Sequence, residues 1–332
     1  MKYVDEFRNH AAGRRLVEEI RRVSRKNINL MEVCGTHTVS IFRFGIREVL
    51  PDNISLLSGP GCPVCVTSNT YIDQAVFLTR EKGVILATFG DMLKVPGSFN
   101  SLDQAKSDGA DVRIVYSTMD ALKLARENPG REVVFLGIGF ETTTPTIAAA
   151  IIEAAAENLS NFSVLCSIKV VPGALEALLN DPMVKIDGFI LPGHVSAVIG
   201  MEPYRFIAGK YGIPAVITGF EPTDILAGIL RLVKRIEAGD AAVENQYSRG
   251  VRDGGNPVAR ELVSRVFEPA EAAWRGVGVI PGTGLVIRDE FKKFDTLSKF
   301  VVDAPESVEH PECRCGEILR GIKVPNECPL FG

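Results

Sequence analysis

The sequence predicts an α/β fold with two similar parallel-sheet βαβ domains and a third, composite domain built from the two chain ends. Short β-branched runs alternate with helical patterns between residues 54 and 238, which is typical of βαβ units. Most runs are continuously apolar, as expected for strands buried on both faces of a parallel sheet. Several runs end in loops rich in glycine, proline and polar residues. Because ligands bind outside the carboxyl ends of such strands, we expect the functional residues at that edge.

The elements follow in order along the chain. The expected strands are residues 54–58, 84–89, 112–117, 133–138, 164–170, 188–192 and 215–219. Helical patterns occur in NTYIDQAVFLTREKG, DALKLAREN, TPTIAAAIIEAAAEN and EPTDILAGILRLVKRIEAG. We divide the α/β part near ENPGRE, into a first domain of residues 52–129 and a second of residues 130–220. Residues 1–51 and 221–332 are expected to form the third domain, which carries a cysteine-rich tail.

Composition narrows the functional classes. The chain has 332 residues, of which 46% are hydrophobic and 23% charged, as in globular proteins with a substantial core. Its net charge of -4 argues against a general nucleic-acid binder. No segment has the pattern of a signal peptide or of a membrane span, so we expect a cytoplasmic location. Cysteine numbers 7, and an odd count without a secretory signal leaves metal binding, catalysis or burial.

The first cysteine motif is MEVCGTHTVS, in which Cys34 and His37 lie three residues apart before a predicted helix. Both side chains are common metal ligands, and a thiolate near a helix N-terminus has a lowered pKa. A buried cysteine with a capping histidine is the plainer interpretation of a lone C-x-x-H. The polar Gly-Thr-His-Thr sequence around the pair favours a functional site.

The second motif, SGPGCPVCVTS, places Cys62 and Cys65 in a C-x-x-C spacing between glycines and prolines. Beside a βα unit in a cytosolic protein, this spacing indicates a redox pair. A stiff loop holds the two sulfurs close and favours disulfide formation. Half of a zinc site is the alternative, with Cys34 and His37 as the other ligands. We favour redox chemistry or transient metal handling, because structural zinc sites are closed and this loop lies at the functional edge.

The tail contains three further cysteines, Cys313, Cys315 and Cys328. Three thiols in a short, loop-rich segment indicate a metal or an iron–sulfur cluster. Nearby basic residues are expected to offset the negative charge of bound thiolates. A cuboidal cluster is usually held by four thiolates, so a fourth ligand must come from elsewhere.

Other polar residues at the expected edge are second-rank candidates. GIGFETTTPT lacks the third glycine of a dinucleotide-binding loop, and its threonines are expected to cap the following helix. Glu141 in this loop, His194 after strand 188–192, and Asp91 and Lys94 after strand 84–89 would all face the edge. Cys166 lies inside a predicted strand and is assigned to the core.

Taken together and in this order, the motifs resemble the HypD family of hydrogenase maturation factors. The resemblance covers essentially the whole chain and rests on MEVCGTHTVSI, SGPGCPVCVTS, ATFGDMLKVPGS, GFETTTPT, LPGHVSAVIG, GNPVAREL, WRGVGVIPGTGL and ECRCGEILRG. It implies a scaffold rather than a conventional enzyme, with two α/β domains and a third domain that holds a [4Fe-4S] cluster. Such proteins work with the small chaperone HypC to assemble the Fe(CN)2CO unit of [NiFe]-hydrogenases, and the HypE–HypF pair delivers the cyanide.

The resemblance also implies roles for individual residues. Cys34 would hold the iron together with a cysteine of the chaperone, and His37 would lie beside it. Cys62 and Cys65 would pass electrons from the cluster towards the iron. The cluster ligands would be Cys313, Cys315 and Cys328. The family pattern continues beyond CPLFG with at least one more cysteine, so the fourth ligand is not in this sequence. The alternatives are an independent thiol–disulfide oxidoreductase and a structural zinc-binding interaction protein.

Overall fold

The computed structural model describes residues 5–331, which form two compact units. Unit 1 contains the described residues up to Cys62, Ala174–Pro257 and the described residues from Arg314 onwards. Unit 2 contains Pro63–Gly173 and Val258–Cys313. Each unit is therefore assembled from segments that are distant in the sequence.

Unit 1 contains a five-stranded, fully parallel sheet with the order β2-β1-β7-β8-β9. Its strands are β1 (Ile28–Glu32), β2 (Ile54–Ser58), β7 (Gly188–Pro192), β8 (Ala215–Thr218) and β9 (Val243–Asn245). The helices are η1 (Asp5–Arg8), α1 (His10–Val23), α2 (Gly35–Arg43), α3 (Ile46–Val49), α9 (Gly193–Ile199), η3 (Glu202–Tyr204), α10 (Arg205–Tyr211), α11 (Pro222–Ala238), α14 (Cys315–Leu319) and η5 (Pro325–Glu327). Helix α8 (Val171–Leu179) contains the boundary at residues 173 and 174.

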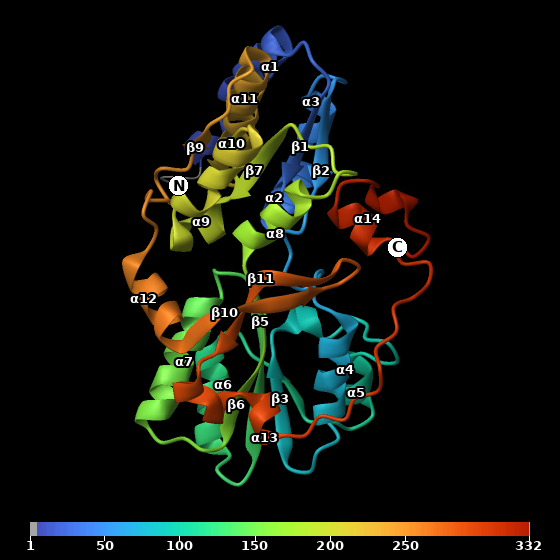
Figure 1. The fold of residues 1–332 in the computed structure, drawn as a ribbon, viewed down its shortest axis with the longest axis vertical. Helices are drawn as coiled ribbons and strands as arrows, with labels where there is room; N and C mark the ends of the chain where they lie inside the picture. The colour runs from blue at the N-terminus through green and yellow to red at the C-terminus, as the bar shows by residue number, and fades with distance from the viewer. Residues whose placement is uncertain (1–4, 332) are drawn as a thin grey trace. The chain divides into compact units, whose positions relative to one another are not determined.

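The core of unit 1 forms where α1 and α11, which lie side by side in Figure 1, cover the sheet. Ile28 and Leu30 of β1 point to this face and pack in one cluster with Ile229 of α11. Helix α11 begins with a capping box between Glu221 and Asp224, and Gly239 ends it in the left-handed conformation that glycine adopts at little cost.

Unit 2 contains a six-stranded sheet with the order β10-β11-β6-β5-β3-β4. Strands β4, β3, β5 and β6 are parallel, and the hairpin β10–β11 joins β6 in antiparallel orientation. The strands are β3 (Val84–Thr88), β4 (Val112–Ile114), β5 (Glu132–Gly139), β6 (Phe162–Lys169), β10 (Phe267–Trp274) and β11 (Gly278–Ile287). The helices are α4 (Asn69–Leu78), η2 (Gly90–Met92), α5 (Leu102–Ser107), α6 (Thr118–Glu127), α7 (Thr144–Ala156), α12 (Pro257–Val266), η4 (Asp289–Phe294) and α13 (Thr296–Lys299).

Helices cover both faces of the parallel part of this sheet. Along β5, Val133 and Phe135 pack in the cluster that includes α6 and α7, whereas Val134 and Leu136 pack in the cluster that includes α4 and α5. Successive side chains of a strand point to opposite faces, so a strand buried on both faces reads as one continuous apolar run. This geometry explains why β5 was recognisable in the sequence.

The α/β fold with two parallel-dominated sheets is confirmed, and all seven expected strands are present. The units cut the chain elsewhere than the expected domains of residues 52–129, 130–220 and 1–51 plus 221–332. The first expected domain supplies β2 to one sheet and β3 and β4 to the other. Residues 1–4 and 332 of the third expected domain lie outside the described residues.

The threonines before Pro145 were expected to cap α7, and one of them stands at its N-cap. Thr143 occupies the N-cap position but has helical backbone angles and makes no capping hydrogen bond with its side chain. The hydroxyl groups of Thr144 and Thr146 instead donate to the carbonyl oxygens of Phe140 and Thr143. Over residues 5–331, no helix combines the length and apolar character needed to cross a membrane.

Candidate functional site

Two thiol-bearing loops meet at the carboxyl ends of β1 and β2. The strands are parallel neighbours, and Glu32 pairs with Ser58 at their last positions, so both loops leave the sheet side by side. The N–H of Gly35 donates to the carbonyl oxygen of Gly61 over 2.9 Å. A Cβ atom at Gly61 would lie 2.1 Å from the Cys34 nitrogen, so only glycine fits there. The loop that carries Cys62 is therefore packed against the backbone of Cys34.

Cys34 is the last residue before α2 and its side chain is buried, with 8% exposed. Burial raises the pKa of its thiol, although the backbone N–H groups of Thr36 and His37 at the start of the helix lower it. The neighbouring carboxylate of Glu32 raises the pKa further. The side chain is therefore a protonated thiol at neutral pH, and a bound cation would favour release of its proton.

Glu32 is a functional candidate that the motif analysis did not single out. It ends β1 with 1% of its surface exposed. One carboxyl oxygen accepts a hydrogen bond from the Cys34 N–H (3.1 Å), and the other accepts one from the Thr38 hydroxyl (2.5 Å). Burial raises the pKa of this carboxyl to about 7. An acidic residue in an otherwise apolar strand, two positions before a cysteine, was the available signal.

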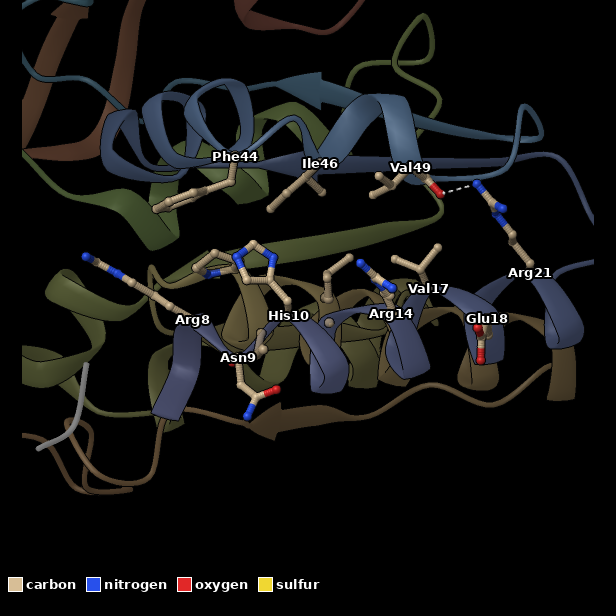
Figure 2. A pocket seen from close by; sticks show the side chains of 14 residues that line it. Arg8, Asn9, His10, Arg14, Val17, Glu18, Arg21, Phe44, Ile46 and Val49 are labelled. Atoms are coloured by element: carbon tan, nitrogen blue, oxygen red, sulfur yellow. Dashed lines mark hydrogen bonds between the residues drawn. The ribbon is translucent and has the colours of Figure 1, made fainter. Parts of the chain in front are cut away.

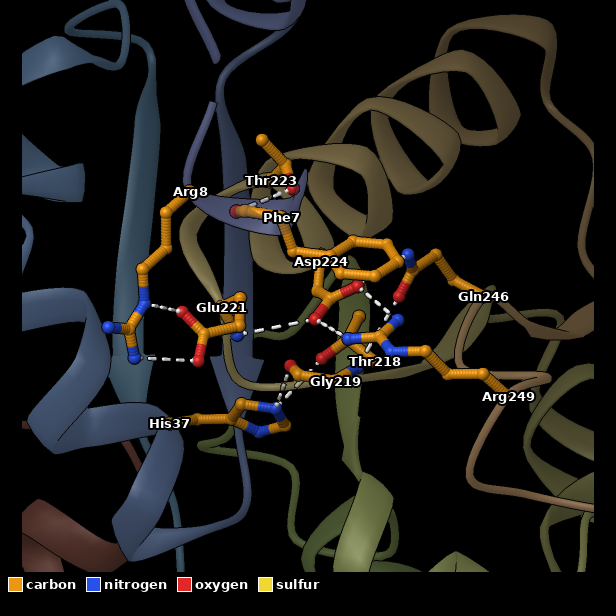
Figure 3. Close-up of polar contacts among 10 residues, drawn as sticks. All are labelled: Phe7, Arg8, His37, Thr218, Gly219, Glu221, Thr223, Asp224, Gln246 and Arg249. Atoms are coloured by element: carbon orange, nitrogen blue, oxygen red, sulfur yellow. Dashed lines mark hydrogen bonds and ion pairs between the residues drawn. The ribbon is translucent and has the colours of Figure 1, made fainter. Parts of the chain in front are cut away.

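His37 is fully buried in the first turn of α2. Its Nε2 atom lies 3.0 Å from the carbonyl oxygen of Gly219 and 2.8 Å from the hydroxyl of Thr218. Figure 3 draws both contacts. Because a carbonyl only accepts, Nε2 carries the proton and donates it to Gly219. Nδ1 is then unprotonated, and it has no hydrogen-bond partner among the described residues. Burial lowers the pKa of the ring to about 4, so His37 is neutral.

His194 reaches the same edge from the start of α9. Its ring stacks on Phe220 with 3.9 Å between centroids, and His37 lies 4.7 Å from the same phenylalanine. Partial burial lowers the pKa of His194 as well. Unit 1 therefore brings four predicted site residues to one edge of its parallel sheet: Cys34, His37, Cys62 and His194.

A buried ion pair holds the loop that carries Phe220. Asp224 is fully buried, and Arg249 donates to both of its carboxyl oxygens over 2.7 and 2.5 Å. Gln246 donates to the same carboxylate over 3.1 Å, as Figure 3 shows. The guanidinium group of Arg249 also lies 3.6 Å from the centre of the Phe7 ring. Sequence reasoning missed this network because its members lie far apart along the chain.

Cys65 belongs to unit 2, since the boundary between the units falls between Cys62 and Pro63. Its side chain is exposed. It lies within a turn that Thr67 closes, because the Thr67 hydroxyl donates to the carbonyl oxygen of Pro63 over 2.8 Å. Exposure of a thiol makes it accessible to exchange with an external partner.

The remaining second-rank candidates also belong to unit 2. Asp91 and Lys94 are exposed after β3. Glu141 is buried after β5, and burial raises its pKa to about 7. One of its oxygens accepts from the Val171 N–H over 2.9 Å, and the other has no partner among the described residues. Lys169, which the sequence did not indicate, is 1% exposed, and burial lowers its pKa to about 8.

The tail cysteines are all half-buried. Cys313 belongs to unit 2, whereas Cys315 and Cys328 belong to unit 1. Over the described part of the chain, no three or more His, Cys, Asp or Glu side chains are arranged to hold a metal ion. The described tail thus contains thiols of the kind that bind iron–sulfur clusters, but they are not grouped as cluster ligands in this structure.

The basic side chains of the tail pair with carboxylates rather than with thiols. Arg320 lies 3.0 Å from Asp181, and Lys323 lies 3.3 Å from Glu317. The expectation that these cations offset thiolate charge therefore has no support in the contacts that they make.

Unit 1 also contains a groove of about 530 Å³, shown in Figure 2. Its apolar lining includes Val17, Phe44 and Ile46, and arginine and histidine side chains of η1 and α1 lie along it. The hydrogen bond from Arg21 to the carbonyl oxygen of Val49 crosses it, with a length of 2.9 Å. None of the predicted site residues lines this groove.

The fold and the site define a class of α/β protein in which the carboxyl edge of a parallel sheet presents cysteine and histidine side chains. A family model named HypD, with the description "Hydrogenase formation hypA family", matches residues 11–332. The chain belongs to this HypD family of hydrogenase maturation factors. The family resemblance of the motifs is confirmed.

Similar proteins match over the full length of the chain. It is 47% identical to the hydrogenase maturation factor HypD of Rhodobacter capsulatus, with 100% of this chain and 91% of the relative covered. It is 48% identical to the Azotobacter vinelandii protein of the same name, with 100% and 90% covered. Identity to the Escherichia coli K12 protein of the same name is 45%, with 100% and 91% covered.

Proposed function

We propose that the protein is a scaffold on which the Fe(CN)2CO unit of [NiFe]-hydrogenases is assembled. In this proposal a HypC-type chaperone docks on the protein, and HypE, working with HypF, donates the cyanide. Iron is the cargo, held between Cys34 and a cysteine of the chaperone. Cys62 and Cys65 form the redox-active pair that serves this site.

The observation that carries the proposal is the contact between the loops of Cys34 and Cys62. The hydrogen bond from Gly35 to Gly61 holds them together, and a Cβ atom built on Gly35 would lie 3.6 Å from that of Cys62. A soft metal bound to Cys34 would therefore lie beside a thiol that can take part in electron transfer. Membership of the HypD family supports the same assignment.

Residues around Cys34 would prepare it for iron. The N–H groups of Thr36 and His37 favour the thiolate that forms when the metal displaces the proton. Glu32, with a pKa near 7, lies close enough to Cys34 to share in the proton balance of that step. Neutral His37, fixed by Gly219 and Thr218, forms a rigid wall of the site.

The proposal is tested by purifying the protein anaerobically together with its chaperone, counting iron, and recording infrared bands of bound cyanide and carbon monoxide. We expect Cys34→Ser to remove the bands and at least ~90% of the cargo iron, because a hydroxyl is a poor ligand for soft metals. Cys166→Ala is the matched control, since Cys166 lies in β6 of unit 2, where its thiol donates to the Leu285 carbonyl oxygen. Bands of normal intensity in Cys34→Ser would contradict the proposal.

A resident [4Fe-4S] cluster in the tail is a separate proposal, based on the thiols of Cys313, Cys315 and Cys328. The iron site is argued from residues around Cys34, so the two proposals are tested separately. Acid-labile sulfide measured in the same preparations decides this point, since cargo iron brings none.

A further inference from the structure

The hairpin β10–β11 holds the chain segment that follows Cys65. Its turn carries Arg275, whose backbone N–H donates to the carbonyl oxygen of Val66 over 3.0 Å. The guanidinium group adds two hydrogen bonds, from Nε to the carbonyl oxygen of Thr67 (2.7 Å) and from Nη2 to that of Pro96 (2.8 Å). The neighbouring Trp274 forms a β-bridge with Thr67. All of these residues belong to unit 2.

The segment held in this way closes the turn that contains Cys65. Thr67 is fully buried, its N–H donates to the carbonyl oxygen of Val64 (3.3 Å), and its hydroxyl donates to that of Pro63 (2.8 Å). Cys65 itself is exposed. The position of its backbone is thus determined by a closed turn whose last residue is fixed to the hairpin.

Arg275 suits this task because its planar guanidinium group carries several donors in a fixed geometry. Both side-chain hydrogen bonds go to backbone carbonyls of other segments, so they add nothing to the pairing of β10 with β11. We propose that Arg275 is a positioning residue for Cys65, and that it sets the equilibrium between the dithiol and disulfide forms of the Cys62–Cys65 pair. This inference rests on the redox role proposed for the pair.

The physical basis is the effective concentration of one thiol near the other. The closed turn begins at Pro63, the residue bonded to Cys62, and contains Cys65, so both thiols are attached to one short turn. A fixed turn restricts them to few relative positions, whereas a loose turn spreads them over many, which disfavours ring closure. In a glutathione buffer, the dithiol and one glutathione disulfide give the protein disulfide and two molecules of reduced glutathione. The protein dithiol loses two electrons and two protons, and glutathione disulfide takes up the two electrons and the two protons.

The experiment titrates the full-length protein with mixtures of reduced and oxidised glutathione, and alkylation with mass analysis measures the Cys62–Cys65 disulfide. We expect Arg275→Ala to lower the equilibrium constant for disulfide formation about tenfold, which corresponds to ~30 mV. Arg275→Lys, which retains a cation but not the fork, should lie between the two. Thr67→Val removes the bond to Pro63 and should shift the constant in the same direction.

Arg288→Ala is the matched control. This arginine belongs to the same hairpin region and also donates to backbone carbonyls, those of Ser264 and Phe267, each over 3.0 Å. We expect it to leave the equilibrium constant within twofold of the wild type. Circular dichroism checks that each variant is folded. If Arg275→Ala does not fold, the milder variant Arg275→Lys is used for the test.

The outcomes separate the two proposals. If the wild type forms the disulfide and neither Arg275 variant changes its equilibrium constant by more than twofold, the positioning role is refuted and the redox role remains. An equal shift in Arg288→Ala would refute it as well, because a general loosening of the hairpin would then be sufficient. If the wild type forms no Cys62–Cys65 disulfide at any glutathione ratio, both proposals are wrong.

Discussion

Individual residues at the site are buried ionisable groups whose charged forms are disfavoured. Glu32 and His37 lie beside Cys34, and burial raises the pKa of the carboxyl to about 7 and lowers that of the imidazole to about 4. Burial is the largest influence on the pKa of both side chains, so exclusion of water dominates their protonation. Such groups are costly for folding and are typical of functional sites.

Glu32→Gln should change how stability depends on pH. The folded-state pKa of about 7 lies above the ordinary glutamate value of 4.5. Between these values the folded protein binds more protons than the unfolded chain, so this group's contribution is complete below pH 4.5 and is lost as pH rises through 7. The loss amounts to ~3 kcal/mol. Urea denaturation at several pH values should show a free energy of unfolding that falls less steeply with pH in the variant.

Glu141→Gln is compared with Glu32→Gln in the same experiment. Burial also raises the pKa of Glu141, which lies in unit 2, to about 7. His37, whose contribution changes with pH in the opposite direction, is present in every protein compared and cancels in the difference. Parallel pH profiles for the wild type and Glu32→Gln would show that the carboxyl of Glu32 is not desolvated as described.

At the scale of elements, the sequence identified the seven strands with short apolar, β-branched runs, but burial alone did not decide which strands were found, since β1 is mostly buried and was missed. GFILP corresponds to β7 to the residue, and its continuous apolar run reflects burial of every residue. ISLLS corresponds to β2 to the residue although Ser55 is exposed. Strand β10 (FEPAEAAW) and strand β11 were missed, since they combine small, polar and glycine residues in an antiparallel hairpin. The position of β1 between β2 and β7 was not predictable, because strand order depends on contacts distant in the sequence.

The same limit applies to the site. Cys34, His37 and Cys62 were found because their types and spacing indicate chemistry. Thr218, which contacts His37, carries no such signal, since a threonine at the end of a strand is common. Its role depends on the distance between α2 and β8, and no local pattern encodes that distance.

Gly228 of α11 sets how closely this helix approaches β8. Helix propensity alone would make Gly228→Ala stabilising by ~1 kcal/mol. A Cβ atom there would lie 2.2 Å from the Cγ2 atom of Thr218, however, in a fully buried position. We therefore expect the variant to lose ~2 kcal/mol of stability, measured by urea denaturation. It should also alter the imidazole NMR signals of His37, since Thr218 must move.

Gly209→Ala provides the matched control in α10 of the same unit. A Cβ atom at Gly209 meets nothing within 4 Å, so propensity should dominate and the variant should gain ~0.5–1 kcal/mol. If Gly228→Ala proved as stable as Gly209→Ala, the close approach of α11 to β8 would be refuted.

The whole molecule consists of two units with separate cores, although the chain passes back and forth between them. Phe294 illustrates this arrangement. A long segment of unit 1, Ala174–Pro257, separates it in sequence from strands β5 and β6, yet it packs with Phe135 and Phe162 of those strands. Ile229, in a segment between the two parts of unit 2, belongs to the core of unit 1. Cooperative folding should therefore follow the units and not the order of the sequence.

Phe294→Ala and Ile229→Ala test this separation. Both side chains are fully buried, so each truncation should cost ~2–5 kcal/mol. Hydrogen exchange read by mass spectrometry should show faster exchange in β3, β5 and β6 for Phe294→Ala, and in β1, β7 and β8 for Ile229→Ala. Each variant is the control for the other, because a chain with one shared core would lose protection in both sheets whichever residue is truncated. Equal losses in both sheets would contradict the division into two units, whereas selective losses would place Cys34 and Cys65 in parts of the protein that unfold independently.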